Sequence, residues 1–224
     1  MSLADKRAKF RALHFEGCFA LPNPWDGSSA LAMEQAGFQA LASTSAGAAW
    51  ALGKEDNAMN VDEVLDHLSM LCRISSLPVN ADFEAGFADN HADLATNVLR
   101  CIDTGVAGLS IEDRHGDRLY TLDEARARIC VARKAIDDSG ADVLLVGRCE
   151  AYLQATLDMD EVVARLTAYG DAGADCLYAP GIGGLANHQR LVESLDKPIN
   201  ANLTKTGLSV ADFAAIGVRR VSIG

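Results

Sequence analysis

Short apolar runs alternate with longer amphipathic segments along almost the whole chain. The runs are continuously hydrophobic, which predicts parallel strands buried on both faces, and the segments between them have helical periodicity. We expect eight strands, at residues 18–21, 40–43, 78–81, 108–111, 143–147, 175–179, 197–201 and 219–223. We expect helices at residues 3–13, 26–37, 61–76, 91–104, 122–139, 160–172, 185–195 and 209–216.

Glycines mark the places where the predicted helices end. A residue-glycine step precedes five of the strands, with its glycine at Gly37, Gly105, Gly140, Gly173 or Gly217. Glycine readily adopts the left-handed conformation that terminates a helix. The alternation of strands and helices therefore predicts an α/β fold, a (β/α)8 TIM barrel formed by a single domain over residues 1–224.

An open, doubly wound sheet is the alternative architecture. No G-x-G-x-x-G motif follows the first strand, and eight parallel strands favour closure into a barrel. The sequence ends at Gly224, directly after the eighth strand, so the helix after strand eight is absent from this sequence.

The composition and net charge of the chain exclude several classes of binding partner. Of the 224 residues, 49% are hydrophobic, which is enough for one well-buried core. There are 20 basic and 31 acidic residues, a net charge of -11, so nucleic acid and anionic lipid would be repelled. No run approaches the roughly 18 apolar residues of a membrane span. The six cysteines form no CxxC pair, which suggests reduced thiols in a cytoplasmic protein.

Acidic side chains follow two of the predicted strands. Asp82 and Glu84 come after the third strand, and Glu112 ends the fourth. If the chain stays extended, Asp82 and Glu84 point to the same side. Carboxylates held this close repel one another unless a cation lies between them, which suits Mg²⁺, or Mn²⁺ in its place. The alternative is a solvated acidic rim, or acids that cap the following helices.

Other polar residues occupy the same predicted edge. Arg148 ends an apolar strand, where its guanidinium could hold a substrate carboxylate or phosphonate, or form a structural salt bridge with Glu112 or Glu150. Residues 43–47, Ser-Thr-Ser-Ala-Gly, predict a loop whose backbone N–H groups can approach an anion. Asp56 is either a fourth acidic residue of the site or an ordinary polar residue of a loop. Trp25 either lines the site or only packs against neighbouring side chains.

Seven segments together resemble the phosphoenolpyruvate mutase and isocitrate lyase superfamily, in its phosphonomutase-like branch. In order they are NPWDGSSALAMEQAGFQALASTSAG (23–47), LGKED (52–56), PVNADFEAGFAD (78–89), GLSIEDR (108–114), GRCEAYL (147–153), RLTAYGDAGADCLYAPG (165–181) and GVRRVSIG (217–224). The resemblance implies a Mg²⁺-dependent barrel enzyme that makes or breaks a C–C or P–C bond beside a carboxylate, through a metal-held enolate.

The resemblance also implies roles for individual residues. Asp82 is expected to be the principal metal ligand, while Asp56, Glu84 and Glu112 act mostly through metal-bound waters. Arg148 is expected to clamp the substrate carboxylate, which the loop also receives. The substrate-binding residues are then Trp25, Ser45, Ala46, Gly47, Asp82 and Arg148, and the catalytic residues are Asp56, Glu112 and Arg148.

The chain departs from the better-known members after the fourth strand. Isocitrate and methylisocitrate lyases carry a Lys-Lys/Arg-Cys-Gly-His loop there, and the mutases carry a gating loop with Lys and Asn. Here the segment of residues 115–120 is short and contains neither of these loop motifs. Glu84 also stands where those members usually have Asp. We expect a homo-oligomeric lyase that cleaves a C–C bond in a small 2-keto or 2-hydroxy dicarboxylate. The alternatives are P–C bond chemistry on a phosphonopyruvate-like acid and a barrel that binds a carboxylate metabolite without turnover.

Overall fold

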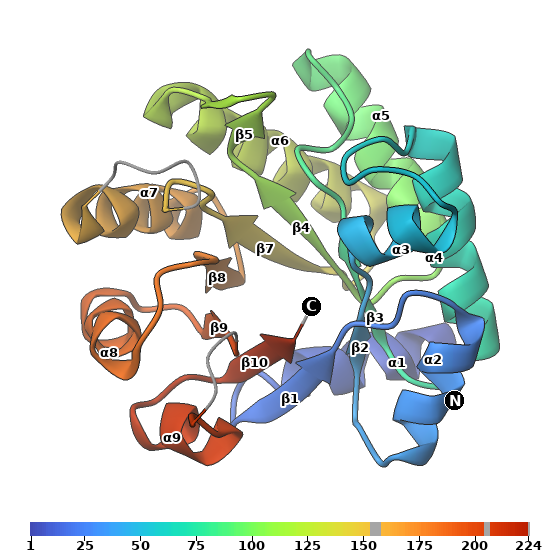
Figure 1. The fold of residues 1–224 in the computed structure, drawn as a ribbon. Coiled ribbons are helices and arrows are strands. Elements are labelled where there is room, and N and C mark those ends of the chain that lie inside the picture. The colour runs from blue at the N-terminus through green and yellow to red at the C-terminus, as the bar shows by residue number, and fades with distance from the viewer. Residues whose placement is uncertain (153–157, 204–206, 224) are drawn as a thin grey trace.

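Eight parallel strands form a nearly closed barrel surrounded by helices (Figure 1). The computed structural model describes residues 1–152, 158–203 and 207–223, so Leu153 and Gly224 of the quoted motifs lie outside it. The order of strands around the sheet is β1-β10-β9-β8-β7-β4-β3-β2. Their bounds are β1 Phe19–Pro22, β2 Leu41–Ala42, β3 Val79–Asp82, β4 Gly108–Glu112, β7 Leu144–Arg148, β8 Cys176–Tyr178, β9 Ile199–Asn202 and β10 Arg220–Ile223.

Helices follow the strands, as the periodicity predicts. They are α1 Leu3–Ala12, α2 Gly27–Gln35, α3 Ser45–Ala51, α4 Val61–Ile74, α5 His91–Asp103, α6 Leu122–Ser139, α7 Met159–Asp171, α8 Leu185–Ser194 and α9 Val210–Ala215. The bounds of α6 agree with the prediction because its end signals are strong. The Thr121 side chain accepts a hydrogen bond from Glu124 N at the start, and Gly140 adopts a φ of 68° at the end. Among the described helices, none combines the length and apolarity that a bilayer crossing requires.

The barrel has one seam, between β1 and β2. Within the described residues these strands share no hydrogen-bonded ladder. Asn23, directly after β1, bridges the seam: its Nδ2 donates to the carbonyl of Ser43 at 3.1 Å, and its Oδ1 accepts from Ile223 N at 3.1 Å. One amide side chain thus ties the ends of β1, β2 and β10 together.

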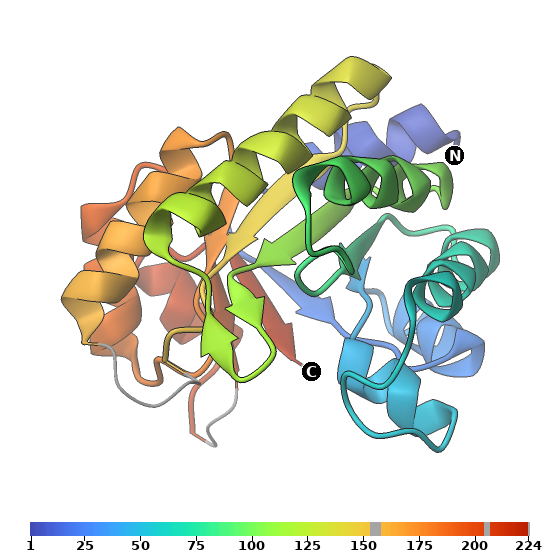
Figure 2. The ribbon, with the colours of Figure 1, turned by 90° about the horizontal axis from the view of Figure 1, so that it is seen from above.

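The two ends of the barrel differ in chemistry. Apolar side chains fill the end at which the strands begin, where Phe10 of α1 packs with Phe19, Leu144 and Val146. Figure 2 shows α1 on the side opposite to α3 and to the small hairpin of β5 (Arg114–His115) and β6 (Arg118–Leu119). Because one end is plugged, polar side chains can meet only in the middle of the barrel and at its other mouth.

One local prediction was wrong, and one local element was not foreseen. Residues 45–47 begin helix α3 rather than a loop, since Thr44 caps this alanine-rich segment by accepting a hydrogen bond from Gly47 N at 3.2 Å. The short stretch after β4 forms the β5–β6 hairpin, whose turn residue Gly116 adopts a φ of 59°.

Candidate active site

A cavity of about 220 Å³ opens at the carboxyl ends of the strands and extends into the barrel. It contains five of the predicted site residues, Ser45, Ala46, Asp56, Asp82 and Arg148. The remaining lining residues are Leu21, Asn23, Ala42, Ser43, Thr44, Asn80, Ser110, Tyr178, Pro180, Asn200, Asn202, Arg220 and Ser222. The carboxyl end of the strands is the place where barrel enzymes carry their chemistry.

Asp82 is the centre of the contacts at the mouth of this cavity. It ends β3 and points inward, and only 16% of its side chain is exposed. One carboxylate oxygen accepts hydrogen bonds from the backbone N–H of Ser45 at 3.0 Å and from its hydroxyl at 3.1 Å. The other accepts from Nη1 of Arg148 at 3.0 Å. Ser45 thus binds the carboxylate of Asp82, while its expected contact with a substrate carboxylate stays a prediction.

Arg148 is surrounded by acids. Its Nε lies 2.5 Å from Glu150 and 3.4 Å from Glu112, in addition to the Nη1 contact with Asp82. The guanidinium carbon lies 5.5 Å from the ring centre of Tyr178, within cation–π range. Burial lowers the pKa of Arg148, but the three carboxylates outweigh this effect and raise the pKa well above its ordinary value. The structural salt bridge that the sequence left open is thus present.

Glu84 does not share the side of Asp82, contrary to the expectation for an extended segment. The strand ends at Asp82, and Glu84 lies in a turn with a φ of 46°. Glu84 and Glu112 line a neighbouring cavity of about 260 Å³ under the β5–β6 hairpin. Burial, followed by the charges of Asp82 and Asp56, raises the pKa of Glu84 to about 7. Burial also raises the pKa of Glu112 to about 8, against the opposing charge of Arg148.

The acids suit a divalent cation in chemistry and in charge. Asp82, Glu84, Glu112 and Glu150 lie near two guanidinium groups, those of Arg148 and Arg114, so the carboxyl groups outnumber the cations. One carboxylate oxygen of Glu84 is buried without a hydrogen-bond partner. Hard oxygen donors of this type are the ligands of Mg²⁺ and Mn²⁺. In the part of the chain that the structure describes, no three Asp, Glu, His or Cys side chains are already grouped as a ligand set.

Trp25 and Gly47 pack against each other outside the barrel cavity. The indole of Trp25 is 45% exposed, lies edge-on to Trp50 at 5.4 Å, and lines a separate cavity with His67 and Met70. A Cβ atom on Gly47 would lie 2.4 Å from Cδ1 of Trp25. The glycine is therefore required by this close packing, and of the two readings of Trp25 the structure shows packing.

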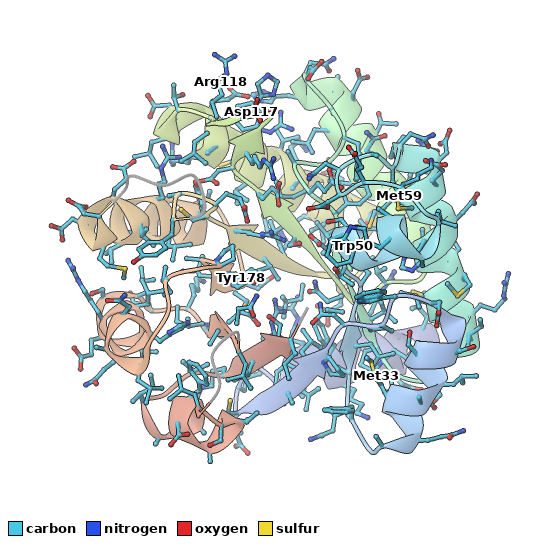
Figure 3. All side chains as sticks on the ribbon, viewed as in Figure 1. Met33, Trp50, Met59, Asp117, Arg118 and Tyr178 are labelled. Carbon is cyan, nitrogen blue, oxygen red and sulfur yellow. The ribbon has the colours of Figure 1, made fainter. Side chains whose placement is uncertain are left out.

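The sequence reasoning missed several polar residues inside the barrel. Figure 3 shows Tyr178 toward the centre of the ring of strands, whereas Asp117 and Arg118 of the hairpin lie at its outer edge. The Tyr178 hydroxyl accepts a hydrogen bond from Asn202 at 2.9 Å. The signal was available, because polar residues alternate with apolar ones in Asn80-Ala81-Asp82 and in residues 200–202, Asn-Ala-Asn. Alternation in a strand directs the polar residues to one side, here the interior.

Known proteins match the whole of this architecture. The sequence matches the phosphoenolpyruvate phosphomutase family over residues 10–224. The 2-methylisocitrate lyase of Escherichia coli is 31% identical over 219 residues, which cover 92% of this chain and 73% of that protein. A candidate lyase/mutase from Burkholderia cenocepacia superposes with a TM-score of 0.96 at 41% identity, covering 99% of this chain and 82% of that one. A 2,3-dimethylmalate lyase superposes with a TM-score of 0.90 at 27% identity, covering 97% and 80%. This chain therefore belongs to the phosphoenolpyruvate phosphomutase family, within the PEP mutase/isocitrate lyase superfamily.

Proposed function

We propose that the protein is a divalent-cation-dependent lyase that cleaves a C–C bond in a small 2-keto or 2-hydroxy dicarboxylate. The observation that carries the proposal is the excess of carboxylates around Arg148 at the mouth of the barrel. Two relatives are named as lyases, one of 2-methylisocitrate and one of 2,3-dimethylmalate, which favours C–C cleavage.

The cation, Mg²⁺ or Mn²⁺, would be held chiefly by Asp82. Glu84 and Glu112, from the neighbouring cavity, and Asp56, at the exposed mouth, would act through water molecules. Such a cation would supply positive charge beside the oxygen on which negative charge develops as the C–C bond breaks.

The remaining steps belong to the side chains of the protein. Arg148 is held in a fixed orientation by its acidic neighbours and by the ring of Tyr178, so it can present positive charge to a substrate without reorganising. Cleavage of a 2-hydroxy acid also requires a group that takes the hydroxyl proton. We assign the uptake of this proton to the carboxylate of Asp56, which lines the cavity at its mouth.

The test is the release of pyruvate or another 2-keto acid from a panel of dicarboxylates and phosphonates, with Mg²⁺ and with EDTA. Cleavage of a dicarboxylate only in the presence of Mg²⁺, lost in Asp82→Asn, is the expected result. Asp117→Asn is the matched control, since it removes a carboxylate from the exposed hairpin. Turnover of phosphonates alone would favour P–C chemistry instead, and no turnover together with tight oxalate binding would favour a binding protein.

A further inference from the structure

A second arginine lies deep in the barrel cavity, and none of the acidic residues that the structure describes contacts it. Arg220 begins β10, is 3% exposed and lines the same cavity as Arg148. Its Nε donates to Oδ1 of Asn200 at 2.7 Å, and its Nη1 donates to Oδ1 of Asn80 at 3.4 Å. Nη1 also lies 3.5 Å from Nε2 of His14.

His14 does not neutralise this arginine and is itself uncharged. Its Nδ1 lies 2.8 Å from the carbonyl oxygen of Phe10, which can only accept a hydrogen bond. Nδ1 therefore carries the hydrogen, and Nε2 presents a lone pair to the guanidinium. Burial, and then the charge of Arg220, lower the pKa of His14 to about 3, so the ring stays neutral.

The two arginines of the cavity thus differ in charge balance. Arg148 contacts the carboxylates of Asp82, Glu112 and Glu150. Among the described residues Arg220 contacts only neutral groups, and burial lowers its pKa. A buried charge without a counter-ion costs several kcal/mol, so an anion that reached Arg220 would be bound favourably.

The guanidinium of Arg220 also retains free hydrogen-bonding capacity. Its Nη2 makes no hydrogen bond with the described residues. The space that Arg220 lines is the barrel cavity. The neighbouring Ser222 and the amides of Asn80 and Asn200 make this region polar.

The strand register places the two arginines on one wall of the cavity. Arg148 pairs with Tyr178, Tyr178 with Asn200, and Asn200 with Arg220, so the four residues form one row across β7, β8, β9 and β10. Three inter-strand steps of about 4.8 Å separate the ends of this row along the curved wall. Both long side chains line the same cavity, so a ligand a few carbons long can lie between them.

We propose that Arg220, with Asn80, Asn200 and Ser222, forms a second anion subsite that binds one carboxylate of a dicarboxylate ligand. The identification of this ligand with the substrate rests on the proposed function, while the subsite itself does not. The second carboxylate of a dicarboxylate would contact Arg220. A monocarboxylate bound at the mouth has no second carboxylate and would not make this contact. The subsite would thereby select dicarboxylates.

The decisive variant is Asn200→Asp, which gives Arg220 an internal counter-ion. The change is isosteric and places a carboxylate at the 2.7 Å contact with Nε, so the fold should be kept or stabilised. In calorimetry with Mg²⁺ present, the wild-type protein should bind malonate at least roughly tenfold more tightly than acetate. This ratio of Kd values corresponds to the free energy of one charge-assisted hydrogen bond. Asn200→Asp should abolish this preference. Malonate binding equal to that of the wild type would overturn the subsite.

Arg220→Gln and Arg219→Gln form a matched pair. Both remove one positive charge from adjacent residues, but Arg219 lies outside the cavity and donates to the carbonyl of Gly17 at 3.3 Å. Only Arg220→Gln should lose the preference for malonate; an equal loss in both would show a general charge effect and overturn the proposal. If Arg220→Gln does not fold, Asn200→Asp still decides.

The same measurements separate this proposal from the proposed function. Malonate preference that disappears in Asn200→Asp, without cleavage of any dicarboxylate, would support the subsite and reject the lyase. Cleavage of a dicarboxylate with the same KM in the wild type and in Asn200→Asp would support the lyase and reject the subsite.

Discussion

Replacement of Arg148 by methionine tests the charge balance at the mouth of the barrel. The variant removes the guanidinium but keeps much of its apolar volume, and it leaves Asp82, Glu112 and Glu150 without their cation. The proposed Mg²⁺ site uses some of the same carboxylates. A divalent cation should therefore compensate for the missing arginine, and this compensation can be measured as stability without any substrate.

The size of the effect follows from burial. The exposed fraction of the side chain is 19% for Arg148, 16% for Asp82, 7% for Glu112 and 2% for Glu150. Removal of one partner from a buried ion pair costs about 3–5 kcal/mol. We expect the lower end, about 3 kcal/mol, because Arg148 and Asp82 keep some contact with water. In a domain of this length the loss lowers Tm by about 6–12 °C.

The assay is thermal unfolding in EDTA and in a series of Mg²⁺ concentrations. A cation present at 100 times its Kd stabilises the folded state by about 2.7 kcal/mol, which would restore most of the loss in Arg148→Met. The wild-type protein should gain less, because Arg148 competes with the cation for Asp82.

Arg165→Met is the matched control. Arg165 is also a buried arginine, 8% exposed, and it contacts Asp113 at 3.2 Å and Glu161 at 2.9 Å, away from the barrel cavity. This variant should lose stability in EDTA and regain none with Mg²⁺. Equal Mg²⁺ shifts in the wild type and both variants, or no shift in any of them, would refute the assignment of the acids to a cation.

Three further predictions concern single residues. Asp82→Asn should lower Mg²⁺ affinity at least tenfold while keeping the native circular dichroism spectrum; unchanged affinity in a metal titration would remove Asp82 from the site. Gly47→Ala should destabilise the protein by about 1–3 kcal/mol in urea unfolding, because its Cβ would overlap Trp25, and a neutral effect would show that the indole can move away. The pKa of His14 is about 3 in the folded protein and ordinarily 6.5, so the unfolded chain binds the proton first and stability falls as pH drops from about 6.5 toward 3. His14→Gln should reduce this slope by up to about 1.4 kcal/mol per pH unit, whereas parallel stability curves for the two proteins would contradict the buried neutral histidine.

The strands and most helices could be predicted because their signals are local. A continuous apolar run such as residues 143–147 reports burial on both faces, and the observed strand β7 is shifted by one residue. Helix α3 was missed because serine and glycine obscured its alanines, and the cap at Thr44 becomes visible only once the chain bends there. The β5–β6 hairpin was missed because its strands have only two residues each.

The site was predicted in composition but not in arrangement. Asp82 and Arg148 were expected at the mouth of the barrel and lie there, in direct contact. Glu84 was expected beside Asp82, but the left-handed turn after β3 directs it to the neighbouring cavity. Backbone conformation after the end of a strand depends on what the chain packs against, and spacing in the sequence does not report it.

By itself, the sequence determined the order of the elements, the closure expected of eight parallel strands and the types of side chain at their ends, because periodicity and residue chemistry are properties of short segments. Only the tertiary structure decided which charges meet. It paired Arg148 with acids that include Asp82, 66 residues away in the chain, and it enclosed Arg220 among neutral amides and a neutral histidine. The physical reason is that ion pairing and burial depend on distances across strands, and these distances exist only once the barrel has formed.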